Sequence, residues 1–231
     1  MARVRCQFAF ACCWLFAAAA AGFAQEEADA HFGTTVVISA GLRGDIYFIP
    51  ENSLKLPKFE KLKPVGTIYT TELNVPVHDF TQGFPGVTGR FEWFAIDYSG
   101  KFWIEKPGKY TFALLSDDGS KLYIDGHTVI DNDGTHSARS YGAVAKLKEG
   151  PHTIRISYFQ GPRTQVALIL AVAPPGDDDF SLFNTEDYLS PDQQREWRQA
   201  KGDAKLSLQE WKAKRKPGAD FIMAPVIPVV P

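Results

Sequence analysis

Between about residues 34 and 174, the chain alternates short apolar segments with turn residues, and no helical periodicity interrupts the series. Turn dipeptides such as Ser99-Gly100, Pro107-Gly108 and Asp125-Gly126 recur roughly every 8–12 residues. Within residues 153–158 polar and apolar residues alternate, as they do in a strand with one buried face. Evenly spaced short strands joined by tight turns predict an all-β fold, an antiparallel, jelly-roll-like β-sandwich.

The first 24 residues have the layout of a secretory signal peptide. Arg3 and Arg5 precede an apolar run, and small residues follow up to a cleavage position after Ala24. All three cysteines of the chain lie in this segment, so we expect a mature chain with neither disulfides nor thiol chemistry. The segment predicts a protein that is secreted, periplasmic or held in the cell envelope.

The charge of the mature chain disfavours two classes of partner. The signal segment holds two basic residues and no acidic ones, against 25 basic and 27 acidic residues in the whole chain. The mature chain is therefore mildly acidic, which gives no support for binding nucleic acid or anionic membranes. No later stretch is long and apolar enough to cross a bilayer, so we expect no transmembrane span in the mature chain.

The character of the chain changes after the predicted sandwich. Residues 175–189 are acidic and predict a linker, and residues 190–231 predict one or two short helices followed by a Pro-rich tail. Ser190 as N-cap and Gln193 three positions later form the capping-box pattern of a helix start. Basic residues outnumber acidic ones between 195 and 216. A solvated tail and a segment that binds an envelope protein both fit this composition.

Asp117 and Asp118 stand side by side at the end of an apolar run, in the sequence LLSDDGS. Neighbouring side chains of an extended strand point to opposite faces, whereas a cis peptide bond would turn both carboxylates the same way. Two carboxylates on one side repel each other and favour a bound cation such as Ca²⁺, which takes six to eight oxygen ligands. An ordinary Asp-Asp-Gly-Ser surface turn is the alternative.

The stretch GKYTFALLSDDGSKLYIDGHTVIDNDG, followed by VAKLKEGPHTIRISYFQGPRTQVALIL, resembles a known family. It is similar to the protective-antigen fourteen-kilodalton domain, a β-sandwich module of anthrax protective antigen, fungal flocculins, adhesins and many bacterial glycosidases. The resemblance covers about residues 40–173 and is densest over 108–170. There a Ser-Asp-Asp-Gly turn is followed by a strand to Asp-Gly, then by a Leu-x-x-Gly-x-His strand and a Tyr-Phe strand.

The resemblance implies a calcium site. In the sugar-binding members the adjacent aspartates are joined by a cis peptide bond and hold Ca²⁺, which binds vicinal hydroxyls of a sugar. Asp117 and Asp118 occupy those positions here. A later loop of the family adds an asparagine, and Gln160 stands in its place in QGPRT. The implied metal ligands are Asp117, Asp118 and Gln160, with a changed reach because glutamine has one more methylene group.

Three further residues are candidate contacts to a glycan. Arg163 lies in the same QGPRT loop as Gln160. Asp133 in DNDG and His136 in GTHSARSYG follow the aspartate pair and would lie at the rim of the site. A plain turn is the alternative for Asp133, and a solvated loop histidine is the alternative for His136.

No catalytic motif accompanies these residues. The sequence has no nucleophile elbow, phosphate loop or zinc-protease helix. Adjacent aspartates that face one ion are too close for a glycosidase, whose two carboxyl groups stand about 5–9.5 Å apart. We therefore expect a non-enzymatic carbohydrate-binding module, with Ca²⁺ as its cofactor and a glycan or cell-surface polysaccharide as its partner. A structural or protein-interaction module of the cell envelope, without sugar binding, is the alternative.

Overall fold

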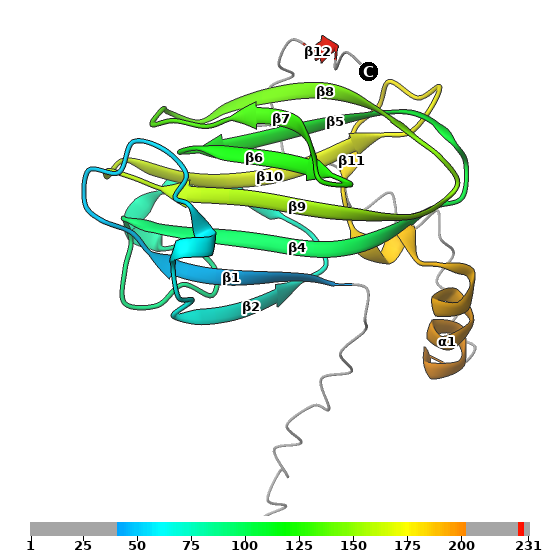
Figure 1. Cartoon of the computed structure of the whole chain (residues 1–231), viewed down its shortest axis with the longest axis horizontal. Helices are drawn as coiled ribbons and strands as arrows, with labels where there is room; N and C mark the ends of the chain where they lie inside the picture. Colours follow the sequence, from blue (N-terminus) through cyan, green and yellow to red (C-terminus); the bar gives the residue numbers. More distant parts are fainter. Residues whose placement is uncertain (1–40, 202–225, 229–231) are drawn as a thin grey trace, which may run out of the picture. The chain divides into compact units, whose positions relative to one another are not determined.

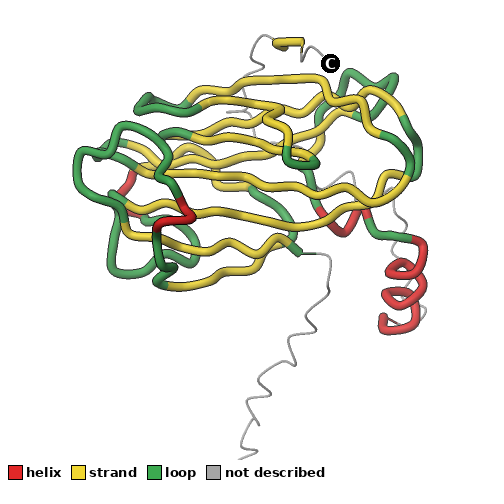
Figure 2. The backbone as a smooth tube through the Cα atoms, viewed as in Figure 1, coloured by secondary structure: helices red, strands yellow, loops and turns green. Residues whose placement is uncertain are grey.

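The structure of the protein is a computed structural model that describes residues 41–201 and 226–228 of the 231-residue chain. The expected signal segment, a strand expected just before residue 41 and the second expected helix lie outside these residues. Figure 1 follows the described elements along the chain, and Figure 2 shows that most of them are strands.

The first sheet has six strands in the order β2-β1-β4-β9-β6-β7, all paired antiparallel. The central pair, β4 and β9, keeps one register over its whole length, from Phe94 opposite Gln160 to Ile104 opposite Gly150. The strands of this sheet are β1 (Leu42–Phe48), β2 (Gly66–Thr70), β4 (Phe94–Ile104), β6 (Ser120–Ile124), β7 (His127–Asn132) and β9 (Gly150–Gln160).

The second sheet has the order β11-β10-β5-β8-β12, with β3 also paired to β10. Its pairings are antiparallel except for the parallel pair of β12 and β8. Its strands are β3 (Asn74–Asp79), β5 (Gly108–Asp117), β8 (Arg139–Leu147), β10 (Gln165–Ala173), β11 (Ser181–Leu182) and β12 (Val226–Pro228). The two sheets form a sandwich, which confirms the predicted all-β, antiparallel fold class.

The core lies between the facing surfaces of the sheets. Ile154, Ile156 and Tyr158 of β9 are at most 1% exposed, whereas the alternate residues Thr153 and Arg155 are exposed. Removing such side chains from water is the main favourable contribution to folding. Other buried members of the same cluster come from both sheets and include Phe94, Ile96, Phe112, Leu114, Leu168 and Leu170.

The β6–β7 hairpin follows the turn chemistry that the sequence predicts. Asp125 and Gly126 connect the two strands with φ values of 51° and 78°. A type I′ turn requires positive φ at both of these positions, and Asp-Gly is a preferred pair for it. The turn places β6 and β7 side by side at the edge of the first sheet.

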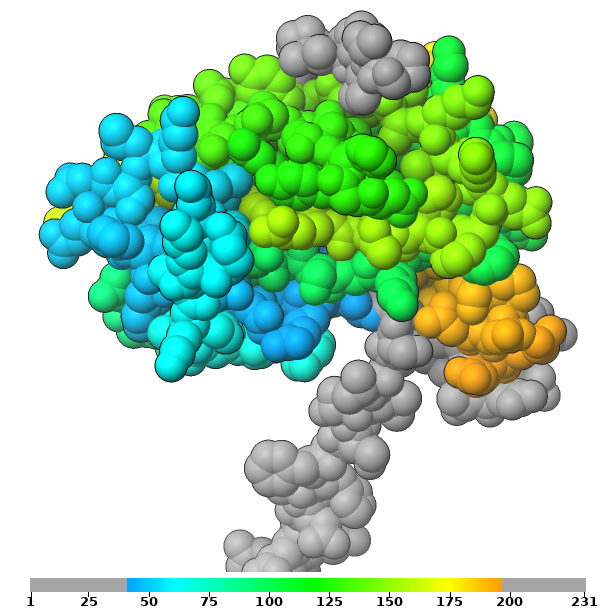
Figure 3. All heavy atoms as spheres, in the orientation of Figure 1, coloured from blue at the N-terminus to red at the C-terminus, as the bar shows by residue number. Residues whose placement is uncertain are grey.

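In the described part of the chain, three short 3₁₀ helices lie in connecting segments: η1 (Phe59–Lys61), η2 (Phe80–Gln82) and η3 (Thr185–Tyr188). The segment between β1 and β2 carries η1 and covers one end of the first sheet's outer face (Figure 3). There Phe59 packs against Tyr47 and Phe159. This segment closes the outer side of the sandwich near the end of β9.

Residues 175–189, which the sequence analysis describes as an acidic linker, partly belong to the sandwich. Phe183 is fully buried, and its main-chain N–H donates to the carbonyl of Leu170 over 2.9 Å. The N–H of Thr185 donates to the carbonyl of Thr71 over 2.8 Å. The acidic run at 177–179 favours a linker in the sequence. The apolar residues Leu182 and Phe183 follow it, and the sandwich buries both.

The helix α1 (Pro191–Lys201) begins where the capping box predicts. The N–H of Gln193 donates to Ser190 Oγ over 3.3 Å, and the N–H of Ser190 donates to Gln193 Oε1 over 2.9 Å. These reciprocal bonds satisfy main-chain donors at the helix start. Among the described residues, no helix is long and apolar enough to span a membrane.

We expect Gly44→Ala in β1 to lower the free energy of unfolding by about 1–3 kcal/mol, as overpacking does. A Cβ at this position would lie 2.6 Å from the ring of buried Tyr98 and 3.0 Å from Ile96 Cγ2. Gly66→Ala in the neighbouring β2 is the matched control, because its nearest contact would be 3.6 Å from Ile46 Cδ1. Urea unfolding of both variants measures the difference, and equal stability would contradict this account of β1 packing.

Candidate functional site

Four strand ends meet at one end of the sandwich, on the left of Figure 1. Asp117 ends β5, and its partner Ala167 lies near the start of β10. Gln160 ends β9, and its partner Phe94 starts β4. The loop between β9 and β10 therefore runs past the aspartate pair and the start of β4.

The Asp117–Asp118 peptide bond is cis, as the family resemblance implies. Both side chains are buried, with 1% and 3% of their surfaces exposed. The two carboxylate oxygens of Asp118 accept main-chain hydrogen bonds, Oδ1 from His136 N–H over 3.0 Å and Oδ2 from Gly161 N–H over 2.8 Å. Asp118 thus connects the β7–β8 loop to the β9–β10 loop.

Asp117 is less well satisfied. Its carbonyl accepts a hydrogen bond from the Tyr158 hydroxyl over 2.7 Å, but its buried Oδ2 has no hydrogen-bond partner among the described residues. Burial, followed by the neighbouring Asp118 carboxylate, raises the pKa of Asp117 to about 7, while the main-chain N–H of Ala138 acts in the opposite direction. Burial also raises the pKa of Asp118, against the two main-chain bonds that it accepts.

Gln160 lies beside the pair, but its amide group is already engaged. The side chain is fully buried. Its Oε1 accepts from the Tyr158 hydroxyl over 2.6 Å, and its Nε2 donates to the carbonyl of Gln165 over 3.0 Å. The structure therefore brings Asp117, Asp118 and Gln160 together, with the amide oxygen directed to Tyr158. The role of Gln160 as a metal ligand stays a prediction.

The part played by Tyr158 is not evident from the sequence, where its position in the β9 alternation marks it only as a core residue. Its ring stacks on Phe84 with centroids 5.2 Å apart and meets Phe94 edge-on at 6.1 Å. Its hydroxyl lies within hydrogen-bonding distance of both Asp117 O and Gln160 Oε1. A buried tyrosine hydroxyl usually finds a hydrogen-bond partner. A tyrosine at a core position of the alternating strand is therefore the one sequence signal that Tyr158 adjoins polar groups.

Gly119 and Gly161 allow close packing around the carboxylates. A Cβ on Gly119 would lie 2.4 Å from the Phe159 ring and 2.8 Å from the main-chain nitrogen of Gly134. A Cβ on Gly161 would lie 3.0 Å from Asp118 Oδ2. The glycine after the aspartate pair is thus required by the close approach of the turn at Gly134.

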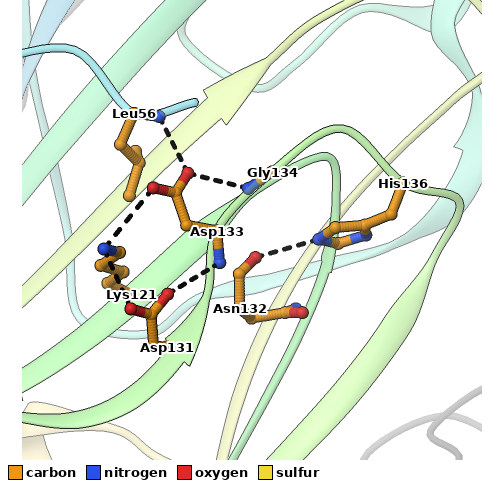
Figure 4. Close-up of polar contacts among 7 residues, drawn as sticks. All are labelled: Leu56, Lys121, Asp131, Asn132, Asp133, Gly134 and His136. Atoms are coloured by element: carbon orange, nitrogen blue, oxygen red, sulfur yellow. Dashed lines mark hydrogen bonds and ion pairs between the residues drawn. The ribbon is translucent and has the colours of Figure 1, made fainter. Parts of the chain in front are cut away.

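Asp133 lies in a polar network with Leu56, Lys121 and Gly134 (Figure 4). Its Oδ1 accepts from the N–H groups of Leu56 and Gly134, each over 2.8 Å. Its Oδ2 lies 3.5 Å from Lys121 Nζ, which also forms a 3.0 Å ion pair with Asp131. Asp133 therefore ties the β1–β2 segment to the hairpin, and a contact between its carboxylate and a glycan stays a prediction.

His136 contacts the pair through its backbone. Its ring Nδ1 lies 2.9 Å from Ser137 O, and Nε2 lies 2.9 Å from Asn132 O, so both ring nitrogens are engaged with carbonyls. Arg163 lies outside the pair, on the exposed part of the β9–β10 loop, in an ion pair with Glu92 over 3.3 Å. Both remain predicted ligand contacts.

The donor chemistry of the pair suits a hard cation. No group of three or more His, Cys, Asp or Glu side chains that could hold a metal occurs in the described part of the chain. Ca²⁺ also accepts carbonyl oxygens and water as ligands. A calcium site can therefore be built from two carboxylates without a third acidic side chain. The unpartnered Asp117 Oδ2 is a carboxylate oxygen that either a cation or a proton would satisfy.

This arrangement predicts a specific pH dependence of stability in chelator. The folded pKa of Asp117, about 7, lies above the ordinary value of 3.8 for this side chain. Between pH 3.8 and about pH 7 the folded state binds more protons than the unfolded state. The free energy of unfolding therefore falls as pH rises through this range, on the order of a few kcal/mol. Urea unfolding in EDTA at several pH values measures the slope.

Asp117→Asn should reduce this slope, because it removes one of the two carboxyl groups whose pKa is raised, and Asp118 accounts for the slope that remains. Asp133→Asn is the matched control, since it changes a nearby carboxylate whose oxygens are already bonded. Identical slopes for the wild type and Asp117→Asn would show that Asp117 is ionised normally.

Comparison with known proteins identifies a family model and several proteins that are similar to this chain. The PA14 domain model matches residues 40–183. The anti-sigma-I factor RsgI3 of Acetivibrio thermocellus is 25% identical over 132 residues, which cover 57% of this chain and 19% of that protein. The chain therefore spans about a fifth of the length of this curated relative.

Two solved structures share the fold. The PA14 domain of the MpAFP antifreeze protein has a TM-score of 0.54 and 18% identity, covering 64% of this chain and 88% of that one. The PA14 sugar-binding domain from an RTX adhesin has a TM-score of 0.52 and 19% identity, covering 63% of this chain and 96% of that one. With the family model matching more than half of its residues, this chain belongs to the PA14 domain family.

Proposed function

We propose that this protein is a secreted, non-enzymatic carbohydrate-binding module that holds Ca²⁺ at Asp117 and Asp118. The single observation that carries the proposal is the buried Asp117 Oδ2, which lacks a hydrogen-bond partner beside a second buried carboxylate. Above pH 7 this arrangement leaves a buried negative charge without compensation, which is costly unless a cation is bound. A bound cation reverses this cost and favours both ionised carboxylates.

The residues present fit calcium in part. Asp117 and Asp118 would hold the ion, and each oxygen of Asp118 keeps a free lone pair beyond the main-chain bond that it accepts. The amide oxygen of Gln160 accepts one hydrogen bond from Tyr158 and likewise keeps a second lone pair, which could bind the ion. When bound, Ca²⁺ would supply open coordination positions for vicinal hydroxyl groups of a sugar.

The relatives support a saccharide as the ligand class. One solved structure with this fold is described as the sugar-binding PA14 domain of an RTX adhesin. Neutral saccharide chains also suit a mildly acidic protein whose first residues predict export. We propose a glycan or cell-surface polysaccharide as the partner, and the cell envelope or the medium as the location.

We propose no catalysis for this site. Hydrolysis of a glycosidic bond needs one carboxyl group as acid and another as base or nucleophile, separated by about 5 Å or more. Asp118 is bonded on both oxygens to main-chain N–H groups, which suits an ionised, fixed carboxylate. Burial nonetheless raises the pKa of Asp118, so it is the close spacing of the two neighbouring carboxyl groups, and not their acidity, that disfavours catalysis.

A second function is favoured by one observation. The amide group of Gln160, at the position where the resemblance implies a third ligand, is oriented by hydrogen bonds to Tyr158 and to the carbonyl of Gln165. A cell-envelope structural or protein-interaction module, without sugar binding, would require no such ligand. Its proposed contact with an envelope protein through the basic C-terminal tail falls on residues outside the described part of the chain.

Calcium binding separates these two functions. We expect millimolar Ca²⁺ to raise the melting temperature, because a ligand held only by the native state stabilises it by about 2.7 kcal/mol at a hundredfold excess over Kd. Asp118→Asn should abolish this shift and any calcium-dependent signal on a glycan array. Asp133→Asn should lower basal stability through the lost ion pair with Lys121, and keep the calcium shift.

The measurements are differential scanning calorimetry with Ca²⁺, Mg²⁺ or EDTA, and a glycan array with and without Ca²⁺. Magnesium is the informative control because it demands a small octahedral shell and gives up its water reluctantly. The absence of any calcium heat in titration calorimetry at millimolar ion would exclude the calcium site. Calcium binding without a glycan signal would instead favour the interaction module.

A further inference from the structure

A hollow of about 350 Å³ is lined in part by Arg163 of the β9–β10 loop. It is formed by the segment before β4, by the start of η2 and by the tip of the β9–β10 loop. Its lining includes Phe80, Arg90, Phe91, Glu92, Trp93 and Arg163. None of the interactions described for the aspartate pair uses these side chains.

The hollow and the aspartate pair share the β9–β10 loop. The N–H of Gly161 donates to Asp118 Oδ2, and Arg163, two positions later, lines the hollow. Main-chain bonds fix both flanks of the loop, from Trp93 N–H to Gln160 O over 2.9 Å and from Phe80 N–H to Thr164 O over 3.3 Å. One short loop thus places the two sites next to each other.

Phe91 is presented to solvent by a well-fixed segment. Its side chain is 52% exposed, and its ring lies against Gly83, where a Cβ would stand 3.2 Å from Phe91 Cε1. Trp93 holds a left-handed φ of 59°, and its carbonyl accepts from Ile49 N–H over 3.0 Å. A half-exposed aromatic ring on a segment fixed in a rare conformation indicates a binding surface better than it indicates a core.

Charged groups stand beside this ring. Arg163 and Glu92 form a 3.3 Å ion pair, and the Arg163 side chain is 73% exposed. The Arg163 guanidinium also lies 6.0 Å from the centroid of the Phe80 ring. Arg163 offers several N–H donors and Glu92 offers acceptor oxygens, so the pair can match adjacent hydroxyl groups that both donate and accept.

We propose that this hollow is a second saccharide subsite, so that the ligand is an oligosaccharide of at least two residues. One sugar would occupy the aspartate site, and the next would lay its apolar C–H face on Phe91 while its hydroxyls meet Arg163 and Glu92. The inference rests on the proposed calcium-dependent glycan binding and extends it from a single sugar to a chain. Trp93 would form part of the wall of this subsite.

The test compares monosaccharides with their own oligomers. The probes are the methyl glycosides of glucose, galactose and mannose, and the matching homo-oligosaccharides of two to four residues, titrated calorimetrically in millimolar Ca²⁺. We expect wild-type protein to bind the oligomers of its preferred sugar about tenfold more tightly than the monosaccharide, the gain typical of one well-placed aromatic contact.

Phe91→Ala should remove this tenfold gain and leave monosaccharide affinity unchanged, whereas Phe91→Tyr should preserve it. Tyr69→Ala is the matched control, because Tyr69 is a 69% exposed aromatic residue on β2 that does not line the hollow. Both positions are exposed enough that we expect all three variants to fold, and their melting temperatures verify this.

The outcomes are distinguishable. If monosaccharides bind through calcium and Phe91→Ala leaves the oligomer-to-monomer ratio unchanged, the subsite is wrong and the proposed function stands. If the wild type binds no member of the series while Asp118→Asn behaves identically, both the function and the subsite are overturned. A third outcome is that the wild type binds a peptide array, and that Phe91→Ala loses this binding while its saccharide affinities are unchanged. This result would assign the hollow to a peptide and overturn the saccharide subsite.

Discussion

The hydroxyl of Tyr158 is the contact through which the candidate site depends on the fold. Its ring belongs to the core, stacked on Phe84 and buried between the sheets, and its oxygen reaches the carbonyl of Asp117 and the amide of Gln160. β9 and β5 lie in different sheets, so the hydrogen bond from this hydroxyl to the Asp117 carbonyl connects the two sheets. Any shift in the core packing around Phe84 would therefore move the end of β5 and the end of β9 together.

Charge makes the same place responsive to ligands. Sandwich interiors tolerate buried carboxylates only where partners satisfy them. Asp118 has two main-chain donors from two different loops, whereas Asp117 Oδ2 has none among the described residues. The fold thus positions one carboxylate firmly and leaves its neighbour to be completed by a proton or a cation. This asymmetry gives the end of the sandwich a chemistry that its apolar core lacks.

The β9–β10 loop links this chemistry to the surface. Gly161 contributes an N–H to Asp118, and Arg163 carries the same loop to the aromatic hollow formed by Phe91 and its neighbours. Backbone bonds at both flanks keep the loop in place without using its side chains. The Arg163 side chain is paired with Glu92 but 73% exposed, so it stays accessible to a ligand, a common arrangement for binding loops on a rigid sandwich.

The features that could be predicted from the sequence alone depend on residues that lie close together along the chain. Period-two alternation and regularly spaced turns specified the sandwich. Asp125-Gly126 specified a hairpin with positive φ at both positions, and Ser190 with Gln193 specified a helix start. Each of these rests on residues within a few positions of one another, where side-chain and turn preferences act directly. The adjacent aspartates were visible for the same reason.

The tertiary structure decided which partners these groups meet. Tyr158 bonds to a carbonyl 41 positions away, and Asp133 turns to the N–H of Leu56, 77 positions away. Gln160 likewise directs its amide to Tyr158, and Phe183 enters the core from a stretch whose acidic composition predicted a linker. No local pattern encodes such pairings, because they arise only when two sheets pack and every buried polar group must find a partner.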